Sequence, residues 1–357
     1  MLKSLLTNLR GRGGDSATVP GPAASTDIPA RQSRFDDRLS VVVPSVAGRE
    51  VFFERALHHL AACSVRWPVF VTDHSRPGEE AVLAEVAARY PALDVRLIRH
   101  PPEMHFLERL ARCADAAQTD YVVLHADDDF MMPATIETSI AFLDGHPGFG
   151  ACKGRTALFA VADGGQVSVG RSDGRTRAEE TPAARVVQHV ANFTPTLYAV
   201  HRRGVFVESC LRTLEVTTNV TFWQYLASCI TVARGKLKTL DGIYYLRLDN
   251  EIGWRSQLIA QRDPGHWPYL AVAPDFSTEL AVFKRALFDL VGGDTGRDAL
   301  ATEIDDACLW LIRRALCNAT REPREPQEEA FSKRLNTPGS EEHRHLEYCV
   351  RCVRGGG

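Results

Sequence analysis

Long apolar runs and concentrated positive charge are both missing from the sequence. No stretch approaches the roughly 20 consecutive apolar residues that a membrane-spanning helix requires, and the first residues lack the apolar core of a signal peptide. The net charge is −3, and no run rich in lysine and arginine is interleaved with aromatic residues. These absences argue against a membrane-embedded protein and against a nucleic-acid-binding protein.

Paired cysteine motifs and phosphate-binding loops are scarce as well. The nine cysteines are an odd number and are scattered along 357 residues. In a chain long enough to bury a large core, this usage is typical of reduced thiols, so we expect a cytoplasmic protein. No Gly-x-x-x-x-Gly-Lys-Ser/Thr motif occurs, and the glycines within residues 11–14 follow no predicted strand. Nucleoside-triphosphate and dinucleotide binding therefore lack a site.

The first 35 residues differ in composition from the rest. Residues 11–33 are rich in Gly, Pro, Ser and Ala, and we expect residues 1–35 as a whole to be a disordered segment and linker. Residues 1–10 place four leucines at helical spacing beside Lys3 and Arg10. This pattern is typical either of a short helix that contacts a membrane surface or a partner weakly, or of a frayed terminus.

Strands and helices alternate over the next hundred residues. The sequence predicts strands at 39–43, 68–72, 95–98 and 121–124, each separated from the next by one helical segment. This order indicates an α/β fold in which a mostly parallel central sheet carries helices on both faces. Ligands of such sheets bind beyond the carboxyl ends of the strands. The polar residues that follow these strands are Pro44, Ser45, Asp73, His74, Ser75, Asp127, Asp128 and Asp129.

The pattern becomes mixed beyond residue 150. Strands are expected at 150–161, 197–201 and 243–248, a polar loop at 162–177, and helices at 220–233, 277–291 and 297–317. From these shifts we predict a main domain at 36–255, a C-terminal helical extension at 256–318 and a flexible tail at 319–357.

The triplet Asp127-Asp128-Asp129 directly follows a predicted strand. Two carboxylates about 4 Å apart repel by roughly 4 kcal/mol at an effective dielectric of about 20. In an extended segment Asp127 and Asp129 point to the same side, where a hard divalent cation would remove this repulsion. A cation held by so few carboxylates completes its coordination with phosphates and water, so the triplet suggests a metal that bridges the protein to a diphosphate. The alternative is an acidic turn that caps the helix beginning at Pro133.

The segments around these residues also resemble a known family. They read SVVVPSVAGREVFFERALHHL, VFVTDHSRP and LARCADAAQTDYVVLHADDDFMMPATIETSIAFLDGHP. Their order and spacing resemble a family-2-like glycosyltransferase with the Rossmann-like GT-A fold, in a bacterial branch whose metal motif is three aspartates followed by phenylalanine. The resemblance covers residues 38–160 well and 190–250 weakly, and it says little about 255–357.

The resemblance implies a nucleotide pocket at the first two strand ends. Pro44 and Ser45 would line this pocket, and Asp73 would contact the base or the ribose. The family usually carries an acidic pair here, whereas His74 replaces the second acid in this sequence.

The resemblance also implies a metal and donor site. Asp129 would be the principal ligand of Mn²⁺ or Mg²⁺, Asp127 would reach the metal or the ribose, and Asp128 would belong to the donor-binding set. Arg109 precedes the metal-binding strand and would contact the donor diphosphate. An exposed helical arginine is the alternative for Arg109.

The sequence after the metal motif contains candidates for a general base. Family members usually carry it in a Glu-Asp pair well after the metal motif, but here Glu215 lacks that partner and Asn219 occupies a plausible position. Glu215 is the candidate for deprotonating the acceptor hydroxyl. Asp249 and Glu251 are alternatives, and a retaining enzyme without such a base stays open.

Three further features suggest ligand contacts. By resemblance, His266 is either an additional metal ligand or an ordinary loop histidine. Three aromatic residues either form a platform for a sugar ring or take part in ordinary packing, namely Trp254, Trp267 and Tyr269. Partial zinc-site spacing occurs near the end of the chain at His343, His345, Cys349 and Cys352.

Together these features predict a metal-dependent glycosyltransferase that uses a nucleotide-diphosphate sugar. The resemblance implies a glycan, lipid-linked or protein acceptor, in the synthesis of surface polysaccharide or glycoconjugates, in the cytoplasm or at the inner face of the membrane. One alternative is a metal-dependent phosphohydrolase, although its Asp-x-Asp strand normally comes first in the domain. The other is a sugar-binding protein of the same fold without turnover.

Overall fold

The computed structural model describes residues 35–161, 167–172, 174–248, 276–292, 297–317 and 326–354. The amphipathic pattern of residues 1–10 and nearly all of the predicted segment 1–35 lie outside the described residues.

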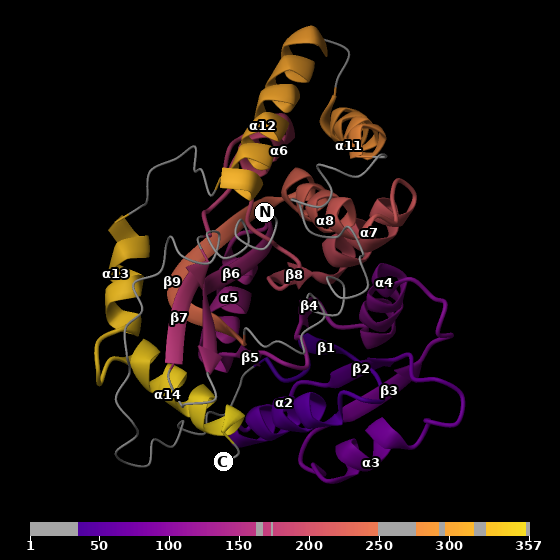
Figure 1. The fold of residues 1–357 in the computed structure, drawn as a ribbon, viewed down its shortest axis with the longest axis vertical. Helices are drawn as coiled ribbons and strands as arrows, with labels where there is room; N and C mark the ends of the chain where they lie inside the picture. Colours follow the sequence, from indigo (N-terminus) through magenta and orange to yellow (C-terminus); the bar gives the residue numbers. More distant parts are fainter. Residues whose placement is uncertain are drawn as a thin grey trace, which may run out of the picture.

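Four parallel strands form the first half of the sheet (Figure 1). They are β1 (Leu39–Ser45), β2 (Val69–Asp73), β3 (Val95–Arg99) and β4 (Tyr121–Leu124), in the spatial order β3-β2-β1-β4. The strands β1, β2 and β4 are short runs rich in valine and are almost entirely buried. This composition suits a parallel sheet that is covered on both faces.

The connecting helices cover both faces of these strands. They are α2 (Glu50–Ala62), α3 (Val82–Ala88), α4 (Phe106–Ala117) and α5 (Pro133–Gly145). Val41 and Val43 of β1 share an apolar core with α2, α3 and α5, whereas Val42 joins α4 on the other face. Successive side chains of a strand point to opposite faces, so both helical layers are anchored by the same strands.

The second half of the sheet mixes strand directions. Its strands are β5 (Phe130–Met131), β6 (Phe149–Val161), β7 (Val167–Ser172), β8 (Val200–Arg202) and β9 (Lys236–Leu248). β8 runs antiparallel to β4 and β6, β9 runs parallel to β6, and β5 pairs antiparallel with β9. Within the described residues these strands complete one nine-stranded sheet. β7 pairs antiparallel with β6 where a polar loop was expected at 162–177.

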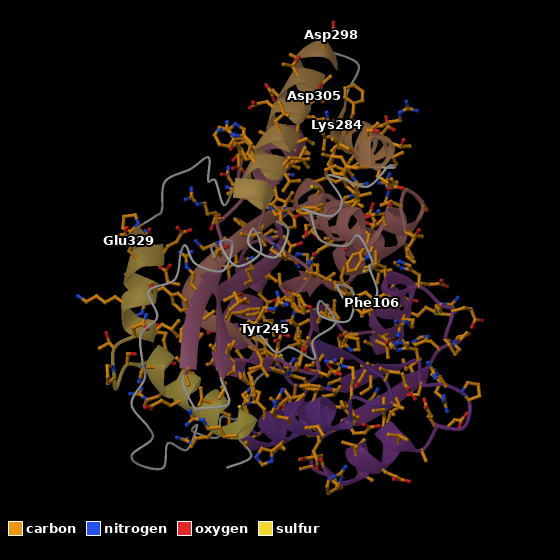
Figure 2. All side chains as sticks on the ribbon, viewed as in Figure 1. Phe106, Tyr245, Lys284, Asp298, Asp305 and Glu329 are labelled. Atoms are coloured by element: carbon orange, nitrogen blue, oxygen red, sulfur yellow. The ribbon has the colours of Figure 1, made fainter. Side chains whose placement is uncertain are left out.

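Further helices lie beside the second half of the sheet. They are α6 (Pro182–Ala191), α7 (Arg203–Leu214), α8 (Val220–Arg234), α11 (Phe276–Val291) and α12 (Arg297–Cys317). α8 packs on β6 and β9, α7 packs on α4, and α11 and α12 pack on α6 and α8. α11 and α12 confirm the two helices expected there, and they share an apolar core with α6 and α8. Lys284 of α11 and Asp305 of α12 form an ion pair at 2.8 Å (Figure 2). None of the described helices is long and apolar enough to cross a membrane.

The last described residues differ from the flexible tail expected at 319–357. α13 (Pro326–Leu335) and α14 (Glu341–Val353) lie beside β9, and α14 reaches α2 at the lower edge of the view (Figure 1). Their few apolar side chains are buried in one cluster with Phe130 of β5, and these are Phe331, Leu335, Leu346, Cys349 and Val350. Only one face of each helix contacts the sheet, so little apolar sequence is needed to hold them.

Candidate functional site

The carboxyl edge of the parallel strands gathers the polar residues that follow them. Ser45 ends β1 beside Asp73 of β2. The chain leaving β4 stays next to β1, because the His125 N–H donates to the carbonyl oxygen of Val42 at 2.9 Å. The Ser45 hydroxyl donates to Asp127 Oδ2 at 2.9 Å. Three strand ends therefore meet at one place.

Arg49 is the main partner of Asp127. Its Nε donates to Oδ2 at 2.8 Å and its Nη2 donates to Oδ1 at 2.6 Å, which makes a bidentate ion pair. Nη2 also lies 3.2 Å from Oδ2 of the half-buried Asp128. Burial raises the pKa of Asp127, while Arg49 and Ser45 act in the opposite direction. The protein itself thus supplies a counter-charge for the first two aspartates.

Asp129 is buried, with 3% of its surface exposed, and is held by β9. Its Oδ1 accepts a hydrogen bond from the Leu248 N–H at 3.0 Å. Its Oδ2 lies 3.4 Å from Arg247 Nε and has no hydrogen-bond partner. Burial raises the pKa of Asp129 to about 7, although the charge of Arg247 acts to lower it. The antiparallel pairing of β5 with β9 sets up this arrangement.

Tyr245 of β9 fixes the chain just before the triplet. Its hydroxyl oxygen accepts from the Ala126 N–H at 2.8 Å and lies 3.3 Å from His125 Nδ1. Tyr245 is buried near the centre of the molecule, on β9 of the second half of the sheet (Figure 2). This contact across the sheet keeps the backbone of the triplet in one position.

The aspartate side chains fit a hard divalent cation. The buried Asp129 Oδ2 lacks a hydrogen-bond donor, and an ionised oxygen in that condition is costly unless a cation is nearby. Asp127 approaches closely enough to raise the pKa of Asp129 further. Among the described residues, no group of three or more His, Cys, Asp or Glu is arranged to bind a metal. The remaining coordination positions would therefore fall to phosphates and water, as is usual for Mg²⁺.

A second cluster of polar residues lies at the end of β2. Asp73 is fully buried, and its Oδ1 accepts from the backbone N–H of Ser75 at 2.8 Å and from its hydroxyl at 2.5 Å. Asp73 Oδ2 has no hydrogen-bond partner and lies 3.9 Å from Arg99 Nε. Half-buried Pro44 lies opposite Thr72 in the adjoining strand pair. One carboxylate oxygen is therefore free to accept a hydrogen bond from a ligand.

Arg109 points into the same region rather than into solvent. Arg109 is only 6% exposed, which contradicts the alternative of an exposed helical arginine. Its Nε and Nη1 have no hydrogen-bond partners, and burial lowers its pKa to about 10. Burial and the neighbouring Arg109 lower the pKa of His74 to about 4. A buried guanidinium with unused donors is suited to an anionic ligand.

Glu215 lies apart from the aspartates. It is exposed at the C-terminal end of α7, and its backbone N–H donates to the carbonyl oxygen of Leu211 at 3.3 Å. The next residues are anchored by Thr217, whose hydroxyl donates to Glu279 of α11 at 3.2 Å. The other residues considered for the base, the metal or a sugar platform lie outside the described residues, namely Asp249, Glu251, Trp254, His266, Trp267 and Tyr269.

The zinc spacing near the end of the chain does not become a metal site in the described residues. His343 is buried, with Nδ1 at 3.1 Å from the carbonyl oxygen of Leu335 and Nε2 at 3.5 Å from Glu347. Cys349 lies in the apolar cluster, and burial raises the pKa of its thiol. By helical spacing, His345, Cys349 and Cys352 share one face of α14, whereas His343 lies on another face.

Three arginines of the site were not predicted from the sequence. Arg49 and Arg247 pair with the aspartates, and Arg55 Nη2 donates to the carbonyl oxygen of Asp128 at 3.3 Å. The repulsion within the triplet signals that some cation must lie nearby. No spacing rule identifies which arginine it is, because the Arg49–Asp127 pair spans 78 positions of the sequence.

Comparison with known proteins places the fold. Residues 37–205 match the model of the family described as glycosyltransferase like family 2. No curated protein sequence matches the chain. Among solved structures, S. aureus TarS is similar at a TM-score of 0.50 and 14% identity, over 89% of this chain and 54% of the TarS chain. The chain thus spans about half the length of that relative.

A second TarS structure, which contains residues 1–349 of that protein, is similar over most of both chains. S. aureus TarS 1–349 in complex with UDP-GlcNAc is similar at a TM-score of 0.50 and 14% identity, over 88% of this chain and 87% of that one. A Pyrobaculum calidifontis mannosyltransferase, solved with GDP-Man and Mn²⁺, has a TM-score of 0.43 and 15% identity, over 98% of this chain and 93% of that one.

The fold and the family match both indicate similarity to family-2-like glycosyltransferases. Residues 37–205 match the model of that family, and the similarity to TarS shows that the protein has the GT-A-type α/β fold. Both the resemblance and the fold class expected from the sequence are confirmed.

Proposed function

We propose that the protein is a metal-dependent transferase that moves a sugar from a nucleotide-diphosphate sugar to an acceptor hydroxyl. The observation that carries this proposal is the buried Asp129 Oδ2, which has no hydrogen-bond donor and lies at the carboxyl edge of the parallel strands. Arg247 Nε lies 3.4 Å from this oxygen without donating a hydrogen bond to it, and a diphosphate-bound cation would supply the direct contact that the oxygen lacks. The family match supports the transferase class.

At the carboxyl edge of the parallel strands, some residues would bind the donor and others would bind the cation. Asp127 and Asp129 would hold Mn²⁺ or Mg²⁺, which stabilises the charge on the departing diphosphate. Asp73 offers its free Oδ2 to a donor group of the base or ribose, beside Pro44 and Ser45. Asp128 completes the donor-binding set.

Arg109 adds charge to this pocket. It presents unused donors to an anionic part of the donor. Hydrogen bonds from a buried guanidinium to a phosphate are stronger than those between neutral groups.

The transfer step breaks the bond between the anomeric carbon and the diphosphate oxygen. The acceptor oxygen bonds to that carbon, and its proton passes to a carboxylate base in an inverting enzyme. Glu215 is the proposed base, with Asp249 and Glu251 as the alternatives. Because Glu215 is exposed at the end of α7, it can reach an acceptor that approaches from solvent.

The acceptor is proposed to be a glycan, a lipid-linked molecule or a protein in surface polysaccharide or glycoconjugate synthesis. The proposal also includes a weak contact of residues 1–10 with a membrane surface. The leucines and the two basic residues of that segment support it.

A donor assay tests the proposed function. The protein is incubated with UDP-GlcNAc or GDP-mannose, with Mn²⁺ or with EDTA, and released nucleoside diphosphate is measured. Release that requires Mn²⁺ and is stimulated by an acceptor supports the transferase. Release of inorganic phosphate from a sugar phosphate would instead indicate a phosphohydrolase. A thermal shift by the nucleotide sugar without any release, across the acceptor classes above, would indicate a binding protein.

A further inference from the structure

Arg49 occupies both oxygens of Asp127, which makes the two metal-binding aspartates unlike each other. Asp127 Oδ1 accepts from Arg49 Nη2, and Asp127 Oδ2 accepts from Arg49 Nε and from the Ser45 hydroxyl. Asp129 Oδ2, in contrast, accepts no hydrogen bond. A cation that approaches Asp129 Oδ2 meets Arg247 at 3.4 Å but no hydrogen bond. At Asp127 it must compete with two hydrogen bonds from Arg49.

The chain delivers Arg49 to this position by a tight turn after β1. Gly48 has a φ of +91°, a conformation that glycine adopts without strain, and the Arg49 N–H donates to the carbonyl oxygen of Val46 at 3.1 Å. The guanidinium also stacks on the ring of Phe52, 4.7 Å from its centroid. Arg49 is thus aimed at the aspartates by the loop and by the first turn of α2.

We propose that Arg49 is the resident counter-cation of the metal site and that a divalent cation must displace it from Asp127. This inference rests on the proposed function of the same site. Two cations near one carboxylate repel each other, so Arg49 lowers the affinity of the empty enzyme for metal. A nucleoside diphosphate reverses this effect, because its phosphates accept the displaced guanidinium. Arg49 therefore couples metal binding to donor binding.

The test measures Mn²⁺ binding directly, by electron paramagnetic resonance of free Mn²⁺, with the full chain and without turnover. The variant R49Q should bind Mn²⁺ alone at least about tenfold more tightly than the wild type, because a competing charge has been removed. UDP should strengthen Mn²⁺ binding less in R49Q than in the wild type. The inference is overturned if R49Q binds Mn²⁺ no more tightly than the wild type does.

A matched control removes another bidentate arginine. Arg38 pairs with Asp144 at 2.7 and 2.9 Å and with Asp120 at 2.9 Å, before β1 rather than after it. The variant R38Q should leave Mn²⁺ binding unchanged. An equal gain in R38Q and R49Q would mean that net charge, not displacement from Asp127, sets the affinity, and would also overturn the inference.

Two more variants keep the test decisive if R49Q folds poorly. R49K retains the charge but not the two-pronged geometry, so its Mn²⁺ affinity should lie above that of the wild type. In the D127N background, R49Q should produce a clearly smaller gain, because the contested carboxylate is gone and only the contact of Arg49 with Asp128 remains. A gain as large in the D127N background as in the wild-type background would contradict the proposal.

The outcome separates this inference from the proposed function. In one outcome, the wild-type protein binds Mn²⁺ with UDP and releases UDP from UDP-GlcNAc, and R49Q has the same Mn²⁺ affinity as the wild type. This outcome overturns only the role of Arg49. Protein that binds no Mn²⁺ in any variant, with or without UDP, overturns both the inference and the metal dependence of the proposed function.

Discussion

The carboxyl edge of the parallel half and two basic residues of the mixed half, Arg185 and Lys153, use buried charge in different ways. At the carboxyl edge of the parallel half, buried charged groups keep unused hydrogen-bonding atoms, as in Asp73, Arg109 and Asp129. In the mixed half, Arg185 is as deeply buried but donates four hydrogen bonds to backbone carbonyl oxygens, at 2.6 to 3.0 Å. Lys153 likewise donates to the carbonyl oxygen of Pro195 at 3.0 Å.

This difference separates binding groups from structural groups. A buried charge that satisfies the backbone holds elements together, whereas one with unused atoms costs free energy until a ligand completes it. Arg185, for instance, joins the end of α8 to the residues just before α6 through Val232, Ala233, Glu179 and Glu180. Substitutions in the two halves should therefore change different quantities.

The largest effect is expected at the parallel edge. Asp129→Asn should reduce turnover about 10³-fold or more and remove Mn²⁺-dependent donor binding, because it deletes a metal-binding charge. The fold should remain intact, since the substitution removes one of three crowded carboxylates. Donor titrations by thermal shift, with and without Mn²⁺, check this. Unchanged Mn²⁺ dependence would remove Asp129 from the ligand set.

The next largest effect concerns Glu215. Glu215→Gln should lower kcat about 10²-fold, the usual scale for loss of a general base, with donor affinity little changed. Steady-state kinetics with a soluble acceptor measures this. A loss below about tenfold would move the assignment to Asp249 or Glu251, or toward a retaining mechanism.

A structural arginine of the mixed half should behave in the opposite way. Arg185→Leu should reduce the free energy of unfolding by about 3 kcal/mol, because two buried and two partly buried carbonyl oxygens lose their donor. Urea denaturation measures the loss. The ratio of donor affinity with and without Mn²⁺ should stay at the wild-type value. A selective loss of donor binding would contradict a purely structural role for Arg185.

Buried histidines should make the protein sensitive to mild acid. Burial lowers the pKa of His59 to about 4, below its ordinary value of 6.5. The unfolded chain therefore binds a proton that the folded chain refuses, and stability is lost as the pH falls from about 6.5 toward 4. His59→Gln should reduce this loss by ~1–3 kcal/mol, measured as urea midpoints at pH 7 and pH 5.

The smallest effect is expected outside both halves. Deletion of residues 1–33 should leave turnover of a soluble acceptor unchanged, because none of the proposed site residues is among them. It should reduce co-sedimentation with anionic vesicles, since burial of four leucines offers only several kcal/mol before the cost of ordering a helix. Equal sedimentation of the two forms would mean that the segment is a frayed terminus.

The parallel half could be predicted closely from the sequence. The strand expected at 39–43 is β1 (Leu39–Ser45), and the helix expected at 50–63 is α2 (Glu50–Ala62). Each strand–helix unit there is local, and its valine-rich strands are bounded by turn residues. The position of the aspartates at a strand end follows from the same pattern.

The mixed half and the partners of the aspartates were harder to predict. β7 is stabilised by β6 rather than by its own composition, and α13 has too little apolar sequence to stand out. Arg247 reaches Asp129 only because β5 pairs with β9 more than a hundred positions later. Such contacts depend on the assembled sheet, which local spacing does not encode.

The packing of α14 on Phe130 has a consequence for synthesis of the chain. Phe130 directly follows the aspartates and is fully buried in the cluster that includes Leu346 and Cys349 of α14. Domains begin to fold from the N-terminus while translation continues, and α14 is the last described element to leave the ribosome. The parallel strands can therefore assemble while the residue that anchors the aspartate triplet is still exposed to chaperones and proteases.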